Sequence, residues 1–198
     1  AVNLYQVSFL GGAFFDDFKI TNPFNNDKTS ITEKKRTYRT IKQELQKLEN
    51  RIDYNIFRVY ELTMHLREVN ELLKNSNLSK TEKGNLLKDK CILWLHQYVS
   101  NFGMDWRKAL TFIFCSGFTF YTILYMIEHL NQEVDFSRIP HFATGFFNYI
   151  LITNFDNPIT GGSLSFIYFP SLIIFIFGKI LIAFGIYEMI QSFRKFRY

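Results

Sequence analysis

Two long apolar runs dominate the second half of the chain. Residues 109–130 hold no charged side chain before Glu128, and residues 166–193 hold only Lys179 and Glu188. At about 1.5 Å per residue, either run as a helix can cross the ~30 Å hydrocarbon core of a bilayer. The pattern therefore predicts two transmembrane helices, at 109–130 and 166–193.

A third apolar run, residues 139–155, lies between these spans and is too short to cross a bilayer alone. Asn154 lies near the end of this run and Asp156 directly follows it, and Gly161 and Gly162 come a few residues later. A span, a short helix, a glycine-bearing loop and a second span form the layout of tetrameric pore domains, although the TVGYG filter of potassium channels is absent. We expect a re-entrant segment whose Asn154 and Asp156 contribute to a pore. An amphipathic segment on the outer leaflet is the alternative.

The first half of the chain is charged, and between residues 27 and 103 its apolar positions recur every three or four residues. This period is typical of amphipathic helices. We expect two helices that pack as a hairpin and break at Asn50 or Asn55, or a single long helix that runs through both. A polar turn then precedes another helix, for which Ser79 or Thr81 is a suitable cap.

The end of that helix, residues 86–101, has the composition of a helix at a membrane surface. Its apolar side chains include Trp94 and Tyr98, and Lys88 and Lys90 lie among them. Helices that combine aromatic and basic side chains in this way lie in the plane of the membrane interface. We therefore expect an interfacial helix at 86–101.

The first 26 residues follow a different period, with a large apolar side chain at about every fifth position. The pattern resembles that of the pentapeptide repeat, which implies a four-sided β-helix, and it breaks at Lys19. A short hairpin with chance spacing is the alternative. Because the coils of a solenoid bury their faces against neighbouring coils, we expect further repeats before Ala1 and regard the sequence as part of a longer chain.

Charge refines this picture in two ways. The mean hydropathy of −0.04 averages two unlike halves, and the net charge of +5 reflects 15 Lys and Arg against 10 Asp and Glu in residues 27–90. Basic residues also precede the first predicted span and follow the second, whereas the loop at 131–165 has one arginine and three acids. The positive-inside rule therefore predicts that both termini are cytoplasmic.

The densest basic run is a candidate binding site for a phosphate-bearing ligand, since guanidinium and ammonium groups pair with phosphate oxygens. A nucleotide or a single-stranded nucleic acid is the partner we expect there, and a solvated helix face is the alternative. The run consists of Lys34, Lys35, Arg36, Arg39 and Lys42. Elsewhere the four histidines are scattered without metal-ligand spacing, and no catalytic motif is present. We therefore predict neither an enzyme, nor a cofactor, nor a metal site.

Lys179 is the most informative charge, because ionisable side chains inside membrane spans are rare and mark functional sites. It lies about 17 Å from the basic end of its span, too far for its side chain to reach the surface. At helical spacing its face continues through Ala183, Ile186 and Ile190. We expect these four residues at a subunit seam or in a pore.

Together these patterns predict a mainly α integral membrane protein in three parts. The parts are the end of a pentapeptide-type β-solenoid at 1–26, a charged cytoplasmic helical neck at 27–103 and a two-span channel-like domain at 104–198. A second interpretation is a membrane-anchored interaction or scaffold module, in which the spans only tether the cytoplasmic parts and conduct nothing.

Three segments resemble a bacterial membrane family in which pentapeptide-type repeats precede a charged helical region and a two-span ion-channel-like domain. The segments are TYRTIKQELQKLEN (37–50), LWLHQYVSNFGMDWRKALTF (93–112) and GKILIAFGIYEMIQSFRKF (178–196). The wider group includes effectors of anti-phage defence such as that of the Hailong system, whose channel a nucleic-acid signal holds shut. The resemblance implies a homo-oligomer, expected to be a tetramer, in the bacterial inner membrane. It also implies gating by the cytoplasmic region and defence by membrane depolarisation.

Overall fold

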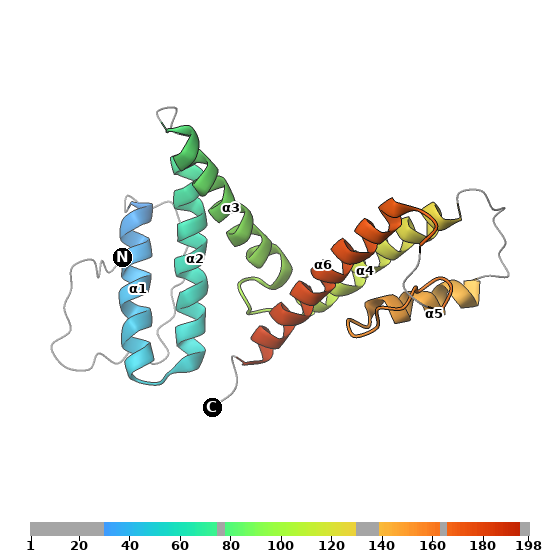
Figure 1. The fold of residues 1–198 in the computed structure, drawn as a ribbon. Helices are drawn as coiled ribbons and strands as arrows, with labels where there is room; N and C mark the ends of the chain where they lie inside the picture. The colour runs from blue at the N-terminus through green and yellow to red at the C-terminus, as the bar shows by residue number, and fades with distance from the viewer. Residues whose placement is uncertain (1–29, 75–77, 130–138, 163–165, 195–198) are drawn as a thin grey trace. The chain divides into compact units, whose positions relative to one another are not determined.

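The computed structural model describes residues 30–74, 78–129, 139–162 and 166–194. Within these residues 81% of the positions are helical and no strand occurs, which agrees with the prediction of a mainly α protein. The predicted solenoid at 1–26 lies outside the described residues. The helices shown in Figure 1 are α1 (Ile31–Lys47), α2 (Arg51–Leu73), α3 (Lys80–Ser100), α4 (Trp106–Glu128), α5 (Ile139–Ile150) and α6 (Phe169–Arg194).

The chain divides into two units. The neck unit comprises the described residues up to Asp105 and the end of α6 from Gln191, and the span unit comprises Trp106–Ile190.

Helices α1 and α2 pack side by side as a hairpin in the neck unit (Figure 1). Their shared core buries Tyr38, Ile41 and Leu45 of α1 against Phe57 and Met64 of α2. The reversal between them follows from local chemistry. Glu49 takes a left-handed conformation (φ 57°), and the Asn50 side chain caps α2 by accepting from the Asp53 backbone N–H. The predicted two-helix hairpin and the break at Asn50 are confirmed.

Ion pairs fasten the two helices of the hairpin along one edge. Glu61 of α2 accepts from Arg39 Nε at 2.7 Å and also from the Lys42 ammonium. Further along, Glu68 accepts from Lys35 and, at 3.2 Å, from the Thr32 hydroxyl. These side chains are 19 to 36 positions apart in sequence, so the pairs fix the register of the hairpin.

The two carboxyls of this edge have shifted pKa values. Burial alone would raise the pKa of Glu61, but the hydrogen bonds from Lys42 and Arg39 outweigh burial and hold it below its ordinary value of 4.5. Burial alone would also raise the pKa of Glu68. The hydrogen bonds from Lys35 and His65 outweigh burial, so the pKa of Glu68 is lowered as well. Both groups are therefore ionised when the hairpin is folded at neutral pH.

Helix α3 begins at Lys80 because Ser79 and Glu82 form a capping box, in which each side chain accepts from the backbone N–H of the other residue. The prediction of Ser79 as a cap is confirmed, and the helix starts well before residue 86. It ends where Asn101 takes a left-handed conformation with φ 51°, since such a residue cannot continue a right-handed helix.

In the span unit, α4 and α6 are both long and apolar enough to cross a membrane. Their bounds differ slightly from the predicted 109–130 and 166–193. Helix α4 starts at Trp106, before its apolar part, because helical hydrogen bonding does not require apolar side chains. Helix α6 starts at Phe169, which places Pro170 in the first turn, where its missing N–H has no intrahelical partner to lose.

The buried side of α4 faces the other two helices of the span unit. Its buried residues recur every three or four positions and are Ala109, Ile113, Gly117, Tyr121, Leu124 and Glu128. Gly117 lies against Ile150 of α5 and Ile182 of α6, and Gly185 of α6 lies against Ile113. The small residues let the helices approach closely, so that α4, α5 and α6 share one apolar core.

Replacing Glu61 tests the ion-paired edge. The Glu61→Gln variant removes the negative charge that Arg39 and Lys42 share and one of the two oxygens that accept from them. We expect it to destabilise the hairpin by about 1–2 kcal/mol. Hydrogen exchange of α1 and α2 amides measures the change. The control is Glu71→Gln, because Glu71 pairs with Lys74 on the exposed surface and its loss should cost about 0.3 kcal/mol. Equal effects of the two variants would contradict this account.

The lowered pKa values also predict a pH dependence. Because Glu61 and Glu68 bind protons more weakly in the folded than in the unfolded chain, their contribution to stability is complete above the ordinary value of 4.5 and is lost as the pH falls through the lower folded values. We expect the melting temperature of the hairpin, followed by circular dichroism, to fall below this pH. The double variant Glu61→Gln, Glu68→Gln should show a flatter profile, and an unchanged profile would refute the assignment.

Candidate functional site

Lys179 lies near the middle of α6 and is the buried cation of the span unit's described residues. Only 5% of its surface is exposed. It belongs to a buried stripe of α6 that also contains Ser171, Phe175 and Ile182. Because these positions are separated by three or four residues, they share one face of the helix. The lysine thus points into the protein and not toward the surroundings of the span unit.

The Lys179 ammonium donates three hydrogen bonds, all to backbone carbonyl oxygens. Its Nζ lies 2.7 Å from the carbonyl oxygen of Tyr149, 2.8 Å from that of Leu151 and 2.8 Å from that of Asn154. An ammonium group has three donors, so its hydrogen-bonding capacity is fully used. The acceptors lie at and just beyond the C-terminus of α5, which ends at Ile150.

This arrangement caps α5 electrostatically. The last carbonyls of a helix lack intrahelical donors, and the aligned peptide dipoles give this end a partial negative charge. The positive charge of Lys179 lies directly against it. Each partner therefore satisfies a polar group of the other that would otherwise be buried alone at high cost.

Aromatic rings complete the surroundings of the ammonium. Its nitrogen lies 5.2 Å from the ring centroid of Tyr149, 5.4 Å from that of Phe175 and 6.0 Å from that of Phe155. These distances are within the range of cation–π attraction. The rings also restrict the access of water, which strengthens the bonds between the ammonium and the carbonyls.

Two glycines bring α5 close enough for this contact. A Cβ added at Gly178 of α6 would collide with the Tyr149 hydroxyl, and one added at Gly145 of α5 would collide with the Tyr121 hydroxyl and lie 2.5 Å from the Pro158 carbonyl oxygen. Any larger residue would push α5 away from α4 or α6. Both positions therefore require glycine for a packing reason.

The loop after α5 has a defined conformation. The Asn157 side chain is buried and accepts from the backbone N–H of Ile159 at 2.9 Å and of Thr160 at 3.3 Å. The Asn154 side chain accepts from the Asp156 N–H at 2.9 Å. These bonds turn the backbone so that the Asn154 carbonyl reaches Lys179, while Asp156 remains exposed.

The structure thus brings together two of the residues predicted for a pore, Lys179 and Asn154. Along the predicted face of α6, burial decreases with distance from this point. Ala183 and Ile186 are half-buried, and Ile190 is 52% exposed. The carbonyls at and beyond the end of α5 contact α6 at Lys179, and Gly185, six residues later, packs on α4. The four residues therefore lie in different environments within one chain.

Three of the five residues of the predicted basic run form ion pairs between the two helices of the hairpin. Lys35, Arg39 and Lys42 are engaged by Glu61 and Glu68, as described above. Lys34 is half-buried and Arg36 is exposed on α1. A phosphate-bearing ligand at this run would have to compete with two carboxylates for three of the five cations.

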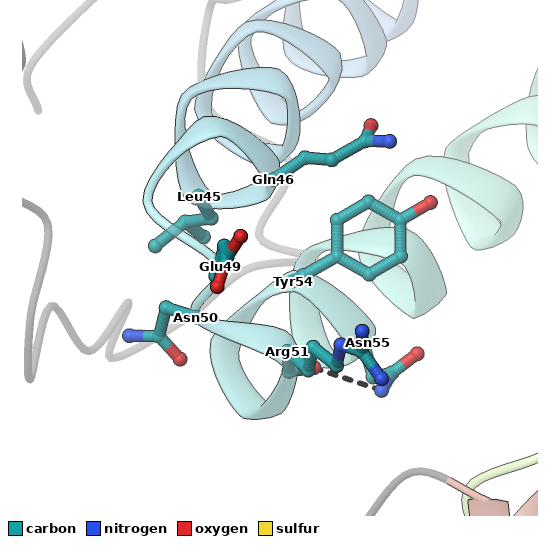
Figure 2. A pocket seen from close by; sticks show the side chains of 7 residues that line it. All are labelled: Leu45, Gln46, Glu49, Asn50, Arg51, Tyr54 and Asn55. Atoms are coloured by element: carbon teal, nitrogen blue, oxygen red, sulfur yellow. Dashed lines mark hydrogen bonds between the residues drawn. The ribbon is translucent and has the colours of Figure 1, made fainter. Parts of the chain in front are cut away.

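A pocket of about 420 Å³ lies at the α1–α2 turn (Figure 2). Its lining residues are Leu45, Gln46, Glu49, Asn50, Arg51, Tyr54 and Asn55. The bond from the Asn55 amide to the Arg51 carbonyl oxygen, at 2.8 Å, belongs to α2 itself. Across the part of the chain that the structure describes, no group of histidine, cysteine, aspartate and glutamate side chains could hold a metal ion.

Sequence reasoning missed a second contact between a buried charge and the backbone, made by Glu128. This carboxylate at the end of α4 is buried and accepts from the Ile167 backbone N–H at 3.1 Å. It joins the end of α4 to the residues just before α6. Its position within a predicted span was the available signal, but a backbone partner leaves no pattern in the sequence.

We compared the chain with protein-family models, curated proteins and solved structures. No protein-family model, curated protein or solved structure matches the chain. The function of the site therefore has to be argued from its own geometry.

Replacing Lys179 tests the cap. The Lys179→Met variant removes the donor of three carbonyl oxygens, one buried and two partly buried, and we expect it to destabilise the span unit by about 3 kcal/mol or more. The measurement is thermal unfolding in detergent micelles, together with hydrogen exchange of residues 149–154. The matched control is Ile180→Met on the exposed side of α6, for which we expect a change below about 0.5 kcal/mol. Similar melting of both variants would show that the carbonyl bonds contribute little.

Proposed function

We propose that the chain is the subunit of an oligomeric, ion-channel-like pore in a bacterial inner membrane, gated by its neck unit. The observation that carries the proposal is the attachment of non-helical backbone to the middle of α6. Lys179 holds the carbonyls of Leu151 and Asn154, which lie beyond the end of α5.

The depth of this attachment follows from helix geometry. Lys179 is about 15 Å from the first residue of α6 and about 22 Å from the last along the helix axis. In a helix that crosses a ~30 Å hydrocarbon core, this position is close to the bilayer midplane. The end of α5 and the loop after it are then inside the membrane, as a re-entrant segment requires.

Non-helical backbone is tolerated at such depth only where protein surrounds it or where it lines a water-filled cavity. Within one chain, Thr153, Asp156 and Thr160 of this loop are exposed. Other subunits around a central axis can cover part of the loop and leave the rest facing water. A ring of four chains is the arrangement we favour, because a span, a short helix, a loop and a second span form the layout of tetrameric pores.

The exposed side of α6 suits contact with lipid or with another subunit. It is apolar along its length and includes Ile173, Ile176, Phe177, Ile180 and Tyr187. A plain two-span anchor needs such a surface too, but it does not need a polar loop held at mid-depth. The loop is therefore what favours a pore over a tether.

The ion-paired hairpin offers a route for gating. A nucleotide or single-stranded nucleic acid that binds Lys35, Arg39 and Lys42 must displace Glu61 and Glu68, because the same cations hold both carboxylates. That exchange removes bonds between α1 and α2 and changes the stability of the hairpin. Depolarisation controlled in this way is the activity expected of a defence effector.

Ion flux tests the proposal. We expect purified protein in liposomes to conduct ions in at least one state, with or without added nucleotides and oligonucleotides. Because Asp156 places an exposed carboxylate on the loop, Asp156→Asn should reduce cation flux about fivefold, whereas Asp89→Asn on α3 should leave it unchanged. A stable oligomer that conducts in no state would exclude the pore and favour the anchored interaction module.

A further inference from the structure

Helix α3 carries large apolar side chains along one face that are about half exposed or more. The residues of this face are Leu87, Cys91, Trp94 and Tyr98, and we call them the α3 stripe. They are four, three and four positions apart, so they lie along one side of the helix. Trp94 is 53% and Tyr98 is 63% exposed. The two rings stack on each other with centroids 5.3 Å apart and planes within 12°, forming a flat aromatic surface.

Lysines border this stripe. Lys83 and Lys90 precede Leu87 and Trp94 by four positions each, so each lies next to a stripe residue on the helix surface. The helix has four lysines and two acids, Glu82 and Asp89. Its surface therefore combines an apolar aromatic strip with an excess of positive charge.

The chain itself determines where this surface can be. Five residues separate Ser100, the end of α3, from Trp106, the start of α4. Fully extended, they allow at most about 21 Å between the two helix ends. The segment is in fact compact, since the backbone N–H groups of Met104 and Asp105 both donate to the Ser100 carbonyl oxygen, at 3.0 and 2.9 Å. Wherever α4 enters a bilayer, the last turns of α3 lie close to that bilayer's surface.

We propose that α3 lies on the cytoplasmic surface of an anionic bilayer, with the α3 stripe at the boundary between headgroups and acyl chains. Tryptophan and tyrosine favour this boundary because their rings are apolar and their polar tips remain hydrated. Lys83 and Lys90 extend from one edge of the stripe to anionic headgroups. The inference rests on the proposed membrane insertion of α4 and assigns the neck unit a membrane contact of its own, in addition to the two spans.

Tryptophan fluorescence in proteoliposomes tests this docking directly. The chain has two tryptophans, so a Trp106→Phe variant reports on Trp94 alone, and Trp94→Phe serves as the complement if Trp106→Phe folds poorly. We expect lipids brominated near the headgroup to quench Trp94 in liposomes that contain phosphatidylglycerol, and aqueous acrylamide to quench it little. Quenching by acrylamide alone would overturn the proposal, because Trp94 would then face water. Protection from both quenchers would also overturn it, because a protein surface such as a second copy would then cover the stripe.

The lysines test the choice of anionic lipid. Each lysine near an anionic surface contributes about fivefold in partitioning, so Lys83→Gln with Lys90→Gln should lower the docked fraction and shift Trp94 emission to the red. The matched control is Lys47→Gln with Lys74→Gln, which removes two exposed lysines from the hairpin and should leave the emission unchanged. Equal bromine quenching in pure phosphatidylcholine would refute the role of anionic headgroups. Ion flux through the same liposomes reports on the pore separately.

Discussion

The span unit depends on one interaction, the contact of the Lys179 ammonium with the carbonyl oxygens of Tyr149, Leu151 and Asn154. A lysine buried among aromatic rings loses its hydration at a cost of several kcal/mol. Three carbonyls at a helix end are equally unfavourable if nothing donates to them. Each group removes the penalty of the other, so neither could be where it is without its partner. The contact thereby joins the short helix α5 to the middle of the long helix α6.

Much of the remaining geometry of the span unit follows from this contact between Lys179 and the end of α5. For the end of α5 to reach Lys179, the helix must lie close to both α4 and α6, and Gly145 and Gly178 provide the space. The loop must then turn back at once, which the side-chain bonds of Asn154 and Asn157 enforce. Glu128 holds the far end of the loop by bonding to the Ile167 N–H. The described residues between α5 and α6 are thus held near both ends by charged side chains from the two long helices.

The sequence predicted those parts of the fold that depend on local pattern. The apolar period located the hairpin and both long helices, and the chemistry of Asn50 and Ser79 located two helix starts. It also identified Lys179 as unusual. It could not identify the partners of Lys179 or Glu128, because a backbone carbonyl or N–H is present at every position and carries no signature. Nor could it pair Lys35 with Glu68, since a basic run on an amphipathic helix looks the same whether it faces solvent or another helix.

The two units neutralise buried charge by different physical means, and the difference bears on the proposed pore. In the neck unit, Glu61 meets full opposite charges at a surface that water still reaches. In the span unit, Lys179 meets the partial charge of a helix end, which avoids desolvating a second ionised side chain. This solution uses all three donors of the ammonium inside one chain. The exposed charge of the loop is then the Asp156 carboxylate, so a path along this loop would present a negative potential to ions and favour cations.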